Sequence, residues 1–172
     1  RISTAGGEPS DLGLAMKNAA SLSVSRQGNL LAYTEYTFDV DLWRLEVPGS
    51  GKKPSRAVRF ASSSQLECTP QFSPDGKKIA FTSARSGKYQ IWVCDSDGRN
   101  LIQLTSARFA GTPRWSPDGR LIGYTVQHID FGSLYVVNAE GGTPRRLTEK
   151  TIDASSGSGS WSKDGKWIYF SS

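Results

Sequence analysis

QFSPDGKKIAF, at residues 71–81, recurs as RWSPDGRLIGY at 114–124 and as SWSKDGKWIYF at 160–170. A degenerate copy, SVSRQGNLLAY, precedes them at 23–33. The starts of successive copies lie 48, 43 and 46 residues apart. Self-similarity at such a period indicates a repeat architecture, and it outweighs any local propensity as evidence about the fold.

Apolar residues align in columns when the copies are superimposed. The position before the turn holds Val24, Phe72, Trp115 and Trp161. Two later columns hold Leu31, Ile79, Ile122 and Ile168, and then Tyr33, Phe81, Tyr124 and Phe170. Because repeats bury a continuous core by stacking on their neighbours, we expect these columns to pack between repeats.

The tetrapeptide SPDG predicts a tight turn. Proline is preset for the second position of a type I turn, aspartate suits the third, and glycine accepts the positive φ that ends it. A cluster of Ser, Asp and Lys could also indicate a reactive site, but its recurrence at the same place in each copy favours a structural role. The predicted turn residues are Asp75, Gly76, Asp118, Gly119, Asp164 and Gly165.

A second phrase follows the first. IWVCDSDGRNLIQLT at 91–105 matches LYVVNAEGGTPRRLT at 134–148, and 42–60 is a looser version. These runs are short, rich in β-branched and aromatic residues, and bounded by turn residues, as strands are. Each period therefore predicts four short antiparallel strands. Only LGLAMKNAA at 12–20 hints at a helical period, and we expect it to be a loop.

Four-stranded units of about 40–45 residues are typical of β-propeller blades. The sequence therefore predicts an all-β fold, a β-propeller with three full blades and two partial blade segments at the termini. The expected full blades are 19–62, 63–107 and 108–150, residues 1–18 end one blade, and 151–172 form the first half of another. The two ends could complete a split blade within one chain, or between two chains in a larger ring.

FSPDGKKIAFTSARSGKYQIWVCDSDGRNLIQLT, at 72–105, resembles the repeat of TolB-like propellers, a WD-like group of bacteria. DLWRL at 41–45, WSPDGR at 115–120 and NAEGGTPRRLT at 138–148 are similar to the C-terminal propellers of large bacterial regulators. Those regulators often carry a winged-helix DNA-binding domain, and some carry a kinase domain. The resemblance implies a regulatory protein of which this chain is a segment without those domains.

Charge and hydropathy limit the kinds of partner that this segment is expected to bind. The net charge is +5, but Lys and Arg are scattered, as at Lys52-Lys53, Lys77-Lys78 and Arg145-Arg146. Nucleic-acid binding needs clustered positive charge, so we expect none by this segment. No apolar run reaches the roughly 18 residues of a membrane span. The opening RISTAGGEPS has no signal-peptide pattern, and the sequence leaves a periplasmic or a cytoplasmic location in a bacterium open.

The two cysteines, Cys68 and Cys94, match no metal-binding spacing. We expect structural thiols, with a disulfide only in an oxidising compartment.

Candidate catalytic and metal motifs are incomplete. His128 is the single histidine, and the sequence has no G-x-S-x-G elbow for a serine nucleophile. Asp95 and Asp97 resemble a calcium loop but lack its third ligand and distal glutamate. GSGKKPS at 49–55 lacks the phosphate-loop pattern. We therefore expect no catalytic residue, no metal and no cofactor.

Binding is expected on the loops that join blades and that join second to third strands, since function usually resides on loops held by a rigid scaffold. Aromatic and arginine residues dominate interface hot spots. The candidate contact residues on these loops are Tyr36, Phe38, Asp39, Arg85, Arg108, Phe109, His128, Asp130 and Phe131. For each one the alternative is that it packs on its own blade.

Three functions fit the sequence. The first is a non-enzymatic module that binds a protein or peptide, or senses a ligand, within a larger bacterial regulator. The second is a segment of a hydrolase-associated propeller, resembling those of prolyl peptidases, that gates a catalytic domain outside this chain. The third is a fragment whose only activity is assembly.

Overall fold

The computed structural model describes residue 8 and residues 19–25, 31–35, 39–46, 56–129, 131–149, 152–154 and 159–171. The chain forms two compact units, Arg1–Phe38 and Asp39–Ser172. Every regular element among the described residues is a β-strand. The protein is therefore all-β, as predicted.

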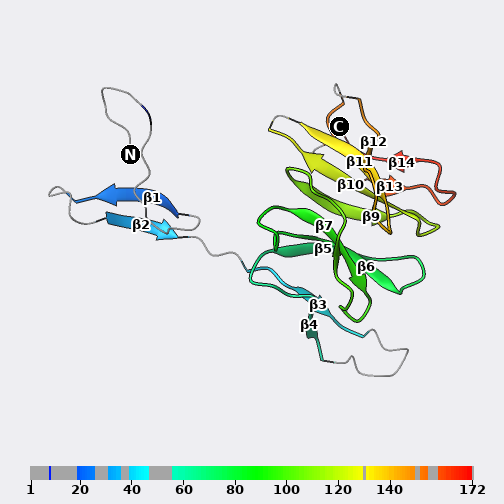
Figure 1. Cartoon of the computed structure of the whole chain (residues 1–172), viewed down its shortest axis with the longest axis horizontal. Helices are drawn as coiled ribbons and strands as arrows, with labels where there is room; N and C mark the ends of the chain where they lie inside the picture. The colour runs from blue at the N-terminus through cyan, green and yellow to red at the C-terminus, as the bar shows by residue number, and fades with distance from the viewer. Residues whose placement is uncertain are drawn as a thin grey trace. The chain divides into compact units, whose positions relative to one another are not determined.

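Two complete four-stranded antiparallel sheets form the centre of the second unit (Figure 1). One contains β5 (Glu67–Phe72), β6 (Lys78–Ser83), β7 (Gln90–Asp95) and β8 (Ile102–Gln103), in that order. The other contains β9 (Ala110–Trp115), β10 (Leu121–Gln127), β11 (Gly132–Asn138) and β12 (Arg145–Arg146), also in sequence order. These sheets confirm the predicted four-stranded antiparallel blade.

The remaining strands pair as two-stranded sheets. In the first unit β1 (Ala19–Val24) pairs with β2 (Leu31–Glu35). In the second unit β3 (Leu42–Arg44) pairs with β4 (Val58–Phe60), and β13 (Ser160–Trp161) pairs with β14 (Ile168–Tyr169). The blade expected at 19–62 draws on both units, so its boundaries and those of the terminal segments stay predictions.

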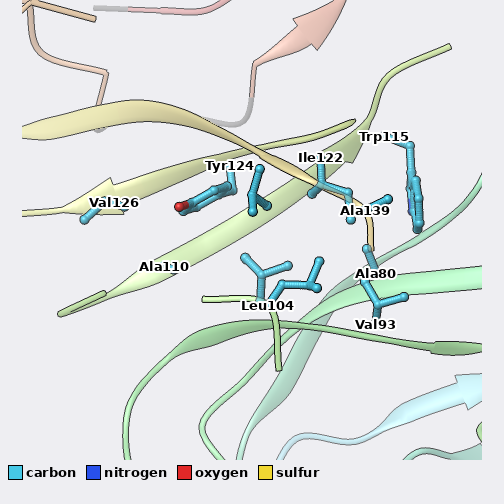
Figure 2. Close-up of a cluster of buried hydrophobic side chains, with 11 residues drawn as sticks. Ala80, Val93, Leu104, Ala110, Trp115, Ile122, Tyr124, Val126 and Ala139 are labelled. Carbon is cyan, nitrogen blue, oxygen red and sulfur yellow. The ribbon is translucent and has the colours of Figure 1, made fainter. Parts of the chain in front are cut away.

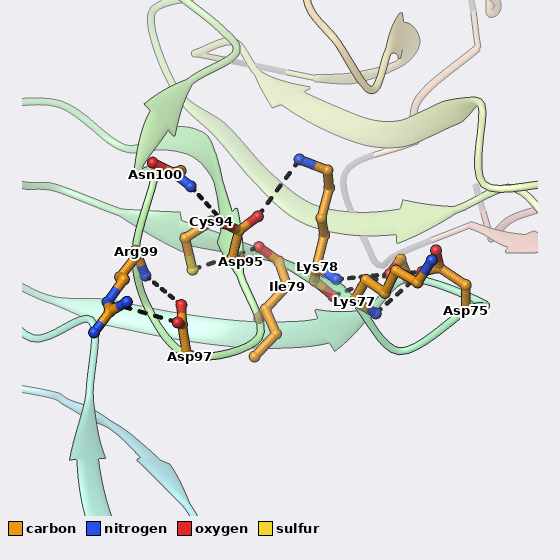
Figure 3. A network of polar contacts seen from close by, with 10 residues as sticks. Asp75, Lys77, Lys78, Ile79, Cys94, Asp95, Asp97, Arg99 and Asn100 are labelled. Carbon is orange, nitrogen blue, oxygen red and sulfur yellow. Dashed lines mark hydrogen bonds and ion pairs between the residues drawn. The ribbon is translucent and has the colours of Figure 1, made fainter.

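The SPDG and SKDG turns share one hydrogen-bond pattern. Gly76, Gly119 and Gly165 have φ of 71°, 72° and 70°. In each turn the serine hydroxyl donates to the aspartate Oδ1 at 2.6 Å, and the same oxygen accepts from a backbone N–H two residues further on. Figure 3 shows this arrangement around Asp75 and Lys77. The turn thus uses the carboxylate as an internal acceptor.

Acid is expected to weaken all three turns. The serine hydroxyl, followed by the backbone N–H, lowers the pKa of Asp75, Asp118 and Asp164. A carboxyl with a lowered pKa in the folded state stabilises the fold above its unfolded pKa of about 3.9, and this stability is lost as the pH falls through the folded value. Thermal melts at falling pH should therefore show a decline beginning near pH 4. An Asp118→Asn variant should decline less steeply, and an identical decline would contradict the assignment.

The main hydrophobic core lies between the two four-stranded sheets. Figure 2 shows Ala80, Val93 and Leu104 from the β5–β8 sheet region facing Ala110 and Ile122 from the β9–β12 sheet. A second cluster joins the β3–β4 sheet to the β5–β8 sheet, and it contains Leu42, Phe60, Ile79, Phe81 and Cys94. Successive sheets therefore stack face to face. Of the predicted column residues, those buried in these clusters are Ile79, Phe81, Trp115, Ile122 and Tyr124.

Tryptophans link neighbouring sheets by hydrogen bonds as well. The Trp115 indole Nε1 donates to the Gln71 carbonyl oxygen at 3.1 Å, and the Trp161 Nε1 donates to the Arg114 carbonyl oxygen at 3.0 Å. Trp115 is 6% exposed, whereas Phe72, at the same repeat position, is 53% exposed. The column thus packs as expected at Trp115, while Phe72 is not covered in this structure.

Candidate functional site

The blades present two different ends. The SPDG turn joins β5 to β6 at one end, so the opposite end carries the start of β5 and the end of β6. The same holds for β9 and β10. We call the second end the loop face, comprising the described residues 61–66, 84–89, 106–109, 128, 129 and 131. Most of the candidate contact residues lie on it.

Arg85 is largely engaged within the loop face. Its side chain is 13% exposed and lies 3.4 Å from the Glu67 carboxylate. Its Nε donates to the Ser83 hydroxyl at 2.9 Å, and its guanidinium also donates to the Ala61 carbonyl. The guanidinium lies over the Phe81 ring, 5.2 Å from its centroid. Arg85 therefore positions other residues more than it offers a free contact.

Glu67 is the partner that the sequence did not single out. Its carboxylate is fully buried, and it accepts hydrogen bonds from the Ser63 hydroxyl, the Ser63 backbone N–H and the Ser83 hydroxyl. The next blade holds Ala110 in the equivalent strand position. A charged residue where the next repeat has an alanine was the available signal.

His128 and Phe131 form a second group on the loop face. Their rings stack with centroids 4.6 Å apart, and the His128 backbone N–H donates to the Phe131 carbonyl at 2.8 Å. The Arg146 guanidinium lies 6.0 Å from the Phe131 ring centroid. Asp130, predicted between them, lies outside the described residues.

Phe109 and Arg108 remain accessible. Phe109 is 43% exposed, and its ring lies 5.5 Å from the Tyr89 ring at an angle of 31°. Arg108 is also exposed. The Phe109 and Tyr89 rings line a cavity of about 200 Å³ between β5–β6 and β9–β10, which we call the inter-blade pocket. The structure thus places the candidate residue Phe109 at a cavity.

The candidate contact residues near residue 40 are distant in sequence from those on the loop face. Asp39 is exposed and lies 3.9 Å from Arg59, which also pairs with Asp41 at 2.6 Å. Tyr36 and Phe38 lie outside the described residues. Their role in binding stays a prediction.

The Asp95–Asp97 turn is satisfied by protein groups. Asn100 donates to Asp95 at 2.6 Å, Lys78 lies 3.7 Å from the same carboxylate, and the Arg99 backbone N–H donates to Asp97 at 3.0 Å (Figure 3). Within the described ranges, no three His, Cys, Asp or Glu side chains gather as a metal site would require.

Both cysteines are free thiols. Cys94 is completely buried, and this burial raises its pKa to about 11. Cys68 is partly buried, and desolvation also raises the pKa of its thiol. Cys68 lines the inter-blade pocket. Among the residues placed by the structure, no helix is long and apolar enough to cross a membrane.

Comparisons with known proteins point to one family. A family model described as the TolB beta propeller domain, PD40, matches residues 55–172. The Protein TolB homolog of Chlorobaculum tepidum is 37% identical over 51 residues, which is 30% of this chain and 12% of that protein.

Solved structures of similar fold agree with the family match. TolB from Acinetobacter baumannii has a TM-score of 0.54 at 21% identity, and the match covers 86% of this chain and 36% of that one. A TolB candidate from Agrobacterium tumefaciens has a TM-score of 0.59 at 23% identity, covering 88% and 53%. The chain thus spans about half or less of each relative's length.

Proposed function

The chain belongs to the TolB beta propeller domain family, and from this premise we propose that it is a non-enzymatic module that binds a protein or peptide through its loop face. The module would serve a larger bacterial regulatory protein, which its resemblance to the propellers of bacterial regulators supports. In that setting the bound partner, or a ligand in its place, is the signal that the regulator senses.

The observation that carries this proposal is the contrast between the two ends of the blades. At the turn end, the Ser–Asp hydrogen bond recurs at 2.6 Å in all three copies. At the loop face the copies differ, since Arg85 stands where the next blade has His128, and Lys88 where it has Phe131. A repeated end builds the scaffold, while a variable end on that scaffold is where recognition is usually found.

Peptide selection tests the proposal. Peptides selected from a random display library against the whole chain should bind the double variant Phe109→Ala/Arg108→Glu at least about tenfold more weakly, because accessible aromatic and arginine residues act as hot spots. The matched control, Trp167→Ala/Arg120→Glu, removes an exposed aromatic and reverses an exposed charge away from the loop face. Equal losses in the two variants would contradict a loop-face site.

A further inference from the structure

The inter-blade pocket is formed by the ends of strands from two neighbouring blades. Cys68 and Thr69 of β5 and Thr82 of β6 line one side, and Gly111 and Thr112 of β9 line the other. Its volume is about 200 Å³. Pockets that enclose a whole small molecule usually measure about 300–1,000 Å³. The inter-blade pocket is therefore of a size for a single large side chain.

The wall of the pocket is apolar although threonines line it. The Thr69 and Thr82 hydroxyls bond to each other at 2.8 Å, and those of Thr112 and Thr125 do so at 2.9 Å. The Thr82 hydroxyl also accepts from the Thr112 backbone N–H of the next blade at 3.2 Å. Because these hydroxyls form hydrogen bonds within the protein, the threonine methyl groups are left to contact a side chain bound in the pocket. A polar guest would lose its water without gaining partners.

Two of the threonines that line the pocket have unusual backbone geometry. Thr69 and Thr112 have φ of 53° and 54°, a region that β-branched residues rarely adopt. Each precedes a proline, Pro70 or Pro113, and the pairing register shifts at both places. Strained backbone persists only where its surroundings enforce it, and it is frequent at ligand clamps. A preformed pocket also costs less to fill.

Two aromatic rings belong to the lining of the pocket, and each follows a basic residue in the sequence. The rings are those of Tyr89 and the exposed Phe109, and a third ring could contact both in the offset geometry that aromatic rings prefer. The residue before each is an exposed cation, Lys88 or Arg108, and neither forms an ion pair with any residue that the structure describes. The lining itself contains no carboxylate.

From these features we infer that the inter-blade pocket anchors one aromatic side chain of a partner peptide, and that Lys88 and Arg108 pair with carboxylates flanking that side chain. This inference rests on the proposed function and names the recognised chemistry. The volume of the pocket and its apolar wall select an aromatic ring as the bound side chain. The two exposed cations select acidic neighbours, because complementary charge favours the right partner and the right register.

Thiol protection at Cys68 reports occupancy of the pocket directly. Iodoacetamide alkylation of the whole chain at alkaline pH is followed by mass spectrometry, with buried Cys94 as the internal standard for unfolding. The probes are acetyl-Glu-Phe-Glu-amide, acetyl-Lys-Phe-Lys-amide and acetyl-Glu-Ala-Glu-amide. The first should slow alkylation of Cys68 severalfold without changing Cys94, and the other two should do so only weakly. Equal protection by all three probes would overturn the inference.

Gly111 offers a variant that fills the pocket. A Cβ built there points at the Thr82 hydroxyl of the neighbouring blade at 3.8 Å, an ordinary contact distance, so Gly111→Ala should fold normally. Gly111→Leu should weaken binding of acetyl-Glu-Phe-Glu-amide about tenfold by occupying the space of the ring, and Gly111→Ala should weaken it less. Unchanged affinity in both variants would overturn the anchor pocket.

The two proposals fail differently. If library peptides depend on Phe109 and Arg108 but neither protect Cys68 nor respond to Gly111→Leu, the loop face binds its partner and the anchor pocket is wrong. If neither library peptides nor the acidic phenylalanine probe bind, both proposals are overturned.

Discussion

Replacing Glu67 by alanine is expected to lower the free energy of unfolding by about 3 kcal/mol. The carboxylate is fully buried, and the Arg85 side chain it faces is only 13% exposed. Removing the acid leaves the guanidinium largely desolvated without its counter-charge, and it also removes the acceptor of the Ser63 backbone N–H at 3.1 Å. Urea unfolding followed by far-ultraviolet circular dichroism measures the loss.

The chain supplies its own control for this prediction. Ala110 and Val126 pair in the next blade as Glu67 and Ser83 pair here, and His128 takes the position of Arg85. The triple variant Glu67→Ala/Ser83→Val/Arg85→His therefore installs a set that already fits this backbone. It should recover more than half of the loss, because it removes the carboxylate and the guanidinium together and so leaves neither of these charges buried without its partner. A triple variant as unstable as Glu67→Ala would show that the cost does not come from the stranded charge.

Trp115→Ala should destabilise the fold by about 3–5 kcal/mol, the range for removing a large aromatic side chain from a core. Trp115 is 6% exposed and packs in the core between the two four-stranded sheets. Trp115→Phe keeps much of the packing and removes the indole bond to the Gln71 carbonyl, so it should cost about 1 kcal/mol plus a smaller packing loss. Urea unfolding again measures both values.

Phe72→Ala is the matched control for Trp115→Ala. Phe72 has the same place in the repeat but is 53% exposed. Its removal should change the free energy of unfolding by about 0.5 kcal/mol or less, as exposed substitutions usually do. Equal losses at Phe72 and Trp115 would contradict the view that the cost at Trp115 comes from packing against the neighbouring blade.

The repeat was sufficient to predict the four-stranded antiparallel sheets from the sequence. KKIAFTS and YQIWVCD were expected to be strands and correspond to β6 (Lys78–Ser83) and β7 (Gln90–Asp95). The reason is that strand propensity, alternation and turn residues all agree within each copy, and three copies repeat the same agreement. Where local signals are consistent in this way, one pattern of pairing is strongly favoured.

The loop face was less accessible to sequence reasoning. Arg85 was expected among the binding residues, yet the structure places it against Glu67, Ser83 and two aromatic rings. Which partner a long side chain selects depends on rotamers and on residues distant in sequence, which periodicity does not encode. The register shifts at Thr69 and Thr112, and the pocket that these residues line, depend on backbone angles that the dipeptide Thr-Pro does not predict.

The indole bonds between neighbouring sheets bear on how such a chain could grow. Trp115 and Trp161 donate to the main-chain carbonyls of Gln71 and Arg114, two residues with unrelated side chains. A main-chain acceptor is present whatever amino acid the neighbour carries there. A gene segment encoding one blade could therefore be copied in tandem. The tryptophan of the new blade could then form its hydrogen bond to a main-chain carbonyl of the neighbouring blade without any further substitution. Each copy would then be free to diverge at its loops, without compensating changes in the blade beside it.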